Sequence, residues 1–129
     1  MIGVSEATAF ERMGGEAALR QVIDRFVDAV VGDLMIGFHF RGVDIPRLKQ
    51  REFEFAARHL GAGVRYSGRP MAQAHGPHRI LVGQFERRMK ILEETLAACG
   101  VPAEVQARWL AHDRALRAPI TGGRGCEDP

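Results

Sequence analysis

A chain of 129 residues has room for one domain with one continuous core, and not for a catalytic domain with a separate regulatory domain. Hydrophobic residues make up 46% and charged residues 26%, a balance that is typical of a soluble globular protein and excludes a wholly disordered one. The formal net charge is only +2 and the basic residues are spread along the chain, which argues against a nucleic-acid-binding protein.

The first long helix is predicted to follow the glycine pair Gly14-Gly15. Apolar residues recur after this pair at spacings of three and four, which places them on one helix face directed at a core. The residues of this face are Leu19, Val22, Ile23, Phe26, Val27 and Val30.

A second helix is predicted to begin near Asp44, because Asp is a favoured N-cap and Pro46 suits a first helical turn. The glycines of the segment 61–63 are expected to end this helix. Its apolar positions are Leu48, Phe55 and Leu60.

A third helix is predicted from about Arg79 to Ala98, with Gly100 as its stop signal, and a fourth is predicted after Pro102. Strand-like alternation is absent, so the sequence predicts an all-α fold. We expect one domain over residues 1–120 and a disordered glycine-rich tail over 121–129. The apolar positions of the last two helices are Leu81, Phe85, Met89, Leu92, Leu96, Val105, Trp109 and Leu116.

Cys99 and Cys126 have no metal-ligand or redox spacing and are too few for a disulfide framework, which predicts a protein of the reducing cytoplasm. The chain has no secretory signal pattern and no run of about 18 apolar residues. We therefore expect neither a secreted nor a membrane-bound protein.

From Phe10 to Leu116 the sequence resembles the group I truncated haemoglobins. No single piece is specific, but their order along the chain is. The resemblance implies a two-over-two helical sandwich around haem b (iron protoporphyrin IX), in which a loop replaces most of the helix that carries the iron ligand. The matching pieces are Phe10 to Gly15, Phe38 to Gly42, Tyr66 to Met71, and Ala74-His75 followed by Ile80.

The resemblance carries the role of proximal iron ligand to His75, and a neutral imidazole is a good ligand for haem iron. Pro77 keeps His75 at the end of a short, loop-like element. We interpret His78 and His112 as solvent-facing, and leave His39 and His59 as minor candidates for a distal ligand. The remaining expected haem contacts are Val27, Phe40, Arg47, Leu48, Arg51, Tyr66, Met71, Phe85 and Leu92.

The sequence departs from the family at the distal side of the haem, where a ligand binds. Val27 and Glu52 stand where oxygen-binding members have tyrosine and glutamine, and Arg88 stands at a position that is usually apolar or tryptophan. Helical spacing directs Glu52 and Arg88 towards one cavity, where an isolated charge is costly and a mutual pair is tolerable. Two alternatives remain open for Glu52 and Arg88. Their side chains extend to solvent at the rim of the cavity, or they form a polar distal site that serves catalysis.

Four functional hypotheses follow. The first is a haem protein that binds O₂, NO or CO, with NO detoxification and a reductase partner implied by the resemblance. The second is a peroxidase-like redox enzyme, favoured if Glu52 and Arg88 lie in the pocket. The third is a haem-based sensor acting through a separate protein, and the fourth is a helical bundle without cofactor. We expect a monomer or a weak homo-oligomer.

Overall fold

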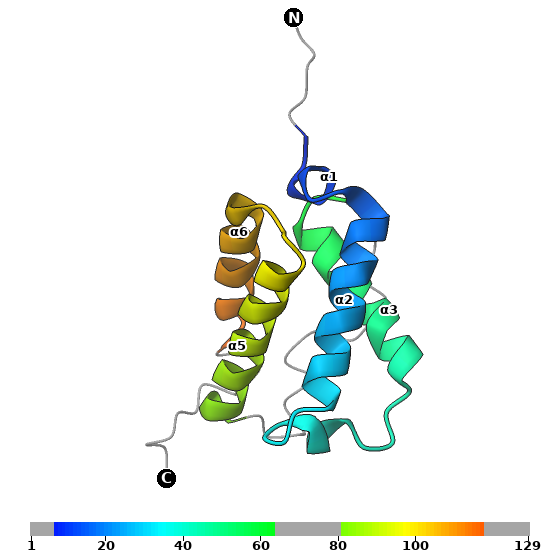
Figure 1. Cartoon of the computed structure of the whole chain (residues 1–129), viewed down its shortest axis with the longest axis vertical. Helices are drawn as coiled ribbons and strands as arrows, with labels where there is room; N and C mark the ends of the chain where they lie inside the picture. Colours follow the sequence, from blue (N-terminus) through cyan, green and yellow to red (C-terminus); the bar gives the residue numbers. More distant parts are fainter. Residues whose placement is uncertain (1–6, 64–80, 118–129) are drawn as a thin grey trace, which may run out of the picture.

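The computed structural model describes residues 7–63 and 81–117, and every regular element within these ranges is a helix. The predicted all-α class is thus confirmed. Figure 1 shows α2 and α3 crossing on one side of the molecule and α5 and α6 running side by side on the other. The elements are α1 (Ala9–Arg12), α2 (Gly15–Val31), the 3-10 helix η1 (Gly37–Phe40), α3 (Ile45–His59), α5 (Val82–Ala98) and α6 (Ala103–Arg114).

The one-turn helix α1 leads directly into α2. Its N-terminus has a capping box, because the Thr8 hydroxyl accepts from the Glu11 amide at 3.1 Å and the Glu11 carboxylate accepts from the Thr8 amide at 2.9 Å. Gly14 has φ 118°, and a Cβ there would lie 2.8 Å from the Ala18 methyl group. The sharp turn between α1 and α2 therefore requires glycine.

Helix α2 is central, since it packs against both α3 and α5. The six apolar residues predicted to share its inner face are all buried, with at most 4% of each exposed, so the predicted stripe is confirmed. Asp44 caps α3 as predicted, because its carboxylate accepts from the Arg47 amide at 3.2 Å. Helix α3 places Phe53, Ala56 and Ala57 in the core.

Two predicted boundaries need correction. Helix α5 begins at Val82 rather than near Arg79, and Leu81 precedes it as an N-cap with 53% of its surface exposed, so Leu81 is not part of the core. Helix α6 ends at Arg114, which leaves Leu116 beyond the helix, where it still packs on the core. The predicted loop-like element that carries His75 and the predicted tail 121–129 lie outside the described residues.

No helix in the described ranges is long and apolar enough to cross a membrane.

Candidate functional site

One face of α3 is intermediate in burial between the core face and the exposed face of the helix. Leu48, Glu52, Phe55 and His59 recur at steps of four, three and four residues, so they form a stripe. All four residues are intermediate in burial, although the side chain of His59 is only 7% exposed, whereas Phe53, Ala56 and Ala57 are buried against the core. This stripe is therefore the part of α3 where the described core is incomplete.

Arg88 of α5 lies against this stripe and forms a three-charge group. Its guanidinium Nη2 is 3.4 Å from Oε1 of Glu52, and its Nη1 is 3.3 Å from Oδ2 of Asp113 on α6. The same guanidinium lies over the Phe26 ring at 4.9 Å from the ring centroid. The side chains of Glu52 and Arg88 are 24% and 22% exposed, and that of Asp113 is 3% exposed.

The contact between Glu52 and Arg88 confirms that the two charges meet, as their spacing predicted. Asp113 was not foreseen as the third member. The only sequence signal was an acidic residue four positions after Trp109, on the face of α6 that carries the buried Val105 and Trp109. A buried acidic residue on such a face requires a cationic partner, and that requirement points to Arg88.

Burial and charge act differently on the members of this group. Burial raises the pKa of the Glu52 carboxyl, and the charge of Arg88 only partly opposes this. Burial also acts against the charge on Arg88, but the two carboxylates outweigh it and raise the pKa of Arg88, which therefore stays cationic. Burial would raise the pKa of Asp113, yet the hydrogen bond with His112 and the charge of Arg88 outweigh it and lower that pKa. Glu52 is thus the carboxyl that gains a proton most readily.

The described haem-contact candidates fall into three groups by burial. Val27, Phe85 and Leu92 are buried, with 2%, 1% and 0% of their surfaces exposed. Phe40 and Leu48 are partly buried and pack against the core, Arg51 is partly exposed, and Arg47 is exposed. The candidates outside the described residues are Tyr66, Met71 and His75.

The histidines differ from the sequence interpretation in one respect. His112 does not face solvent freely, because its ring stacks on that of His59 with centroids 3.7 Å apart and its Nδ1 is 3.0 Å from Oδ1 of Asp113. Burial lowers the pKa of His59 to about 4, with Asp113 opposing this, so His59 is neutral at physiological pH. His39 lies on η1, with its buried Nε2 unpartnered within the described part of the chain. His78 lies outside the described residues.

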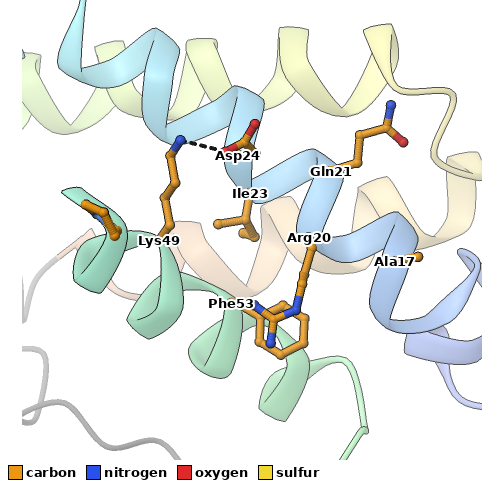
Figure 2. A pocket seen from close by; sticks show the side chains of 8 residues that line it. Ala17, Arg20, Gln21, Ile23, Asp24, Lys49 and Phe53 are labelled. Carbon is orange, nitrogen blue, oxygen red and sulfur yellow. Dashed lines mark hydrogen bonds and ion pairs between the residues drawn. The ribbon is translucent and has the colours of Figure 1, made fainter.

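A groove between α2 and α3 is shown in Figure 2, and its charged groups are already paired. The Lys49 ammonium lies 2.6 Å from Asp24 and 2.9 Å from Asp28, and Arg20 lies over the Phe53 ring at 3.9 Å. These contacts explain the raised pKa of Lys49, for which the hydrogen bond to Asp24 is the largest cause. The candidate functional site is therefore the Glu52–Arg88 side of α3 rather than this groove.

Comparison with known proteins identifies the kind of fold that carries this site. The bacterial-like globin family model matches residues 8–121. The chain is 33% identical over 117 residues to the group 1 truncated hemoglobin GlbN of Mycolicibacterium paratuberculosis, covering 91% of this chain and 86% of that protein. It is 26% identical over 112 residues to a group 1 truncated hemoglobin of Tetrahymena thermophila, covering 84% and 93%.

Solved structures agree on the fold. The truncated hemoglobin of Tetrahymena pyriformis in its Fe(III) form matches with a TM-score of 0.82 and 24% identity, covering 88% of this chain and 97% of that one. The 2/2 hemoglobin of Synechococcus in the cyanomet state matches with a TM-score of 0.81 and 22% identity, covering 90% and 99%. The predicted two-over-two helical fold is confirmed by these matches.

Proposed function

The chain belongs to the bacterial-like globins and, within them, to the truncated haemoglobins, and from this premise we propose that it binds diatomic ligands at a haem held by His75. Membership of the family makes haem b its cofactor and haem-based gas binding its general activity. Haem supplies an iron centre that binds O₂, NO or CO and exchanges electrons. The role of His75, the choice of ligand and the reaction are our proposals.

The described residues fit such a group. A porphyrin needs an apolar wall with space beside it. Leu48 and Phe55 give α3 a half-buried apolar face, while Val27 and Phe85 are buried apolar residues on α2 and α5. The 24% exposure of Glu52 within this face supports a space beside it that solvent reaches. Arg47 and Arg51 are cations on the same helix that suit the haem carboxylates.

The distal chemistry that we propose rests on Arg88. Val27 has no hydrogen-bond donor, so it cannot supply the hydroxyl group that the family's oxygen-binding members carry at this position. Arg88 is a fixed cation whose guanidinium has five N–H donors. Its Nη1 donates to Asp113 and its Nη2 donates to Glu52, and the other N–H groups are available to a ligand. A site of this kind favours ligands and reacting groups that carry negative charge.

The observation that carries the proposed distal chemistry is the three-charge group of Glu52, Arg88 and Asp113 beside an otherwise apolar face. It favours, as a second candidate, a peroxidase-like activity, in which the guanidinium stabilises developing negative charge on a peroxide and Glu52 accepts or returns a proton. NO detoxification is the alternative turnover, and it consumes one NO, one O₂ and one electron from a reductase for each nitrate formed.

Haem binding is tested by loading the purified protein with iron protoporphyrin and recording ferric, ferrous and CO-bound spectra. We expect a Soret band that shifts on CO binding and a five-coordinate, histidine-ligated ferrous spectrum. An unchanged free-haem spectrum would refute haem binding by this chain.

The distal role is tested with Arg88→Leu against Arg87→Leu, the same change one position earlier on α5, where Arg87 pairs with Asp33 at 2.7 Å. We expect Arg88→Leu to weaken cyanide binding and slow peroxide reaction at least tenfold while changing CO affinity less than threefold, because CO carries little negative charge. Arg87→Leu should leave all three near wild type. Equal behaviour of the two variants would place Arg88 outside the ligand site.

A further inference from the structure

The last turn of α3 faces α6 through a cluster that shares Asp113 with the three-charge group and adds two histidines. It consists of His59 on α3 and of His112 and Asp113 on α6. Oδ1 of Asp113 lies 3.0 Å from Nδ1 of His112 and 3.7 Å from Nε2 of His59. Two imidazole rings from different helices thus direct a nitrogen towards the same carboxylate oxygen.

His59 is buried without the partners that a buried imidazole needs. Its side chain is only 7% exposed, yet neither ring nitrogen has a hydrogen-bond partner among the described residues. A buried polar group without a partner costs free energy, so native structures rarely retain one unless it serves a ligand. The Nε2 atom of such a neutral imidazole offers a lone pair to a cation.

The surrounding residues hold the three side chains in place. The Phe55 and Trp109 rings meet His59 edge-on at centroid distances of 5.7 and 5.8 Å. The second oxygen of Asp113 is held by Arg88 at 3.3 Å, which leaves Oδ1 for the imidazoles. A carboxylate that binds a metal through one oxygen and a cationic donor through the other is a common arrangement around metal ions.

Charge also favours a cation here. The connected group contains two carboxylates, Glu52 and Asp113, but only one guanidinium, that of Arg88, so it has an excess negative charge when both acids are ionised. Arg108 donates to the backbone carbonyl of His59 at the surface, where its charge offsets this excess only in part. His112 is 34% exposed, which gives an ion a route from solvent.

We propose that His59, His112 and Asp113 form a binding site, separate from the haem, for a divalent transition-metal ion. Two imidazole nitrogens and one carboxylate oxygen are a donor set that suits Zn²⁺, and the metal–ligand bonds place tetrahedral ligand atoms about 3.3 Å apart. The donor atoms here already lie within 4.8 Å of one another, and two of the separations, 3.0 and 3.7 Å, bracket that value. Binding of one ion by all three donors requires the stacked rings to tilt, and the fourth coordination position of the ion is left for water.

The test uses the haem-loaded ferrous protein under CO, which occupies the haem iron, with a tag that contains no histidine. The protein is stripped with a chelator and titrated with ZnCl₂ by calorimetry, and the zinc-bound sample is measured by X-ray absorption at the zinc edge. We expect one Zn²⁺ per chain and a first shell of two imidazole nitrogens with additional oxygens. Absence of a stoichiometric zinc ion in the wild type, or a shell containing sulfur, would overturn the proposal.

Matched variants assign the ligands. His59→Gln and His112→Gln should each weaken Zn²⁺ binding at least tenfold, whereas His39→Gln and His78→Gln, made at histidines outside the cluster, should bind as the wild type does. Circular dichroism and the CO spectrum check that each variant is folded and loaded. Should His59→Gln fail to fold, the partly exposed His112 decides the matter, and wild-type affinity in a folded His112→Gln would refute the site.

Discussion

Arg88 is the residue on which the interior charges depend, and its removal should be the most destabilising single change in the group. In Arg88→Leu, Asp113 and Glu52 lose the guanidinium that lies 3.3 and 3.4 Å from them. Breaking a buried ion pair by deleting one partner costs about 3–5 kcal/mol. We expect a value at the lower end, about 3 kcal/mol, because Glu52 and Arg88 keep some contact with solvent.

Removal of Glu52 should cost far less. Burial already raises the pKa of this carboxyl, so its charged form contributes little favourable energy, and Glu52→Leu should change stability by about 1 kcal/mol or less. In the Arg88→Leu background the same change removes an unpaired buried carboxylate and becomes favourable. The double variant should therefore be milder than the sum, with a coupling of about 1–2 kcal/mol. Asp113 still lacks its arginine partner in the double variant, so the loss of Glu52 restores only part of the stability.

The assay is urea unfolding of the CO-bound ferrous protein at fixed haem concentration, with circular dichroism and Soret absorbance as paired probes. The pKa of Asp113 is lowered in the folded wild type, so this group stabilises the protein above its unfolded pKa, and that contribution is lost as the pH falls through its folded pKa. In Arg88→Leu the part of this lowering that comes from the charge of Arg88 is lost, while the hydrogen bond with His112 remains. The gap between the two proteins should thus hold from pH 7 to about pH 4 and narrow as the pH falls below about 4. Additive free energies and a pH-independent gap would refute the coupling.

Three further outcomes are expected. His75→Ala should lose haem several-fold faster to apomyoglobin, with partial recovery of the ferrous spectrum on adding imidazole, and an unchanged spectrum would mean that another histidine is the ligand. Val27→Tyr should slow O₂ dissociation in stopped-flow measurements by supplying a hydroxyl donor, and an equal or faster rate would show that residue 27 does not face the ligand. Asp33→Asn should lower the melting temperature at neutral pH, because the Asp33 carboxylate accepts hydrogen bonds from Arg87 and from two backbone amides. The hydrogen bond with Arg87 is the main cause of the lowered pKa of Asp33. The difference in melting temperature between the variant and the wild type should therefore disappear as the pH falls below about 4.

The helical spacing of apolar residues was sufficient to predict the long helices, because burial of one helix face dictates that spacing. The inner face of α2 and the Asp44 cap of α3 are local consequences of which residues are apolar and which side chain reaches the first helical turn. Leu81 shows where periodicity fails, since an apolar residue in phase with a helix carries no information about whether the chain has entered that helix. Glycines, by contrast, placed the turn at Gly14 correctly, because backbone geometry rather than packing requires them there.

The site was less accessible from sequence for a different reason. Glu52 and Arg88 could be paired because each breaks an apolar stripe, but Asp113 and the stacked histidines lie where α3 and α6 meet, and that contact is tertiary. Helical spacing assigns a residue to a face of its own helix and does not say which residue of another helix it meets. His112 was accordingly interpreted as facing solvent, although its ring stacks on His59.

The choice of arginine at position 88 follows from the number of acceptors around it. A guanidinium holds its donors in a planar fork, so one side chain can engage Asp113 through Nη1 and Glu52 through Nη2 and still present unused N–H groups to a third acceptor. A lysine ammonium has the same charge, but its three donors share one nitrogen, so it cannot offer a separate nitrogen to each carboxylate. Charge alone therefore does not account for the residue. Arginine is explained by the need to connect α3 and α6 through α5 while leaving a donor on the side of the half-buried face.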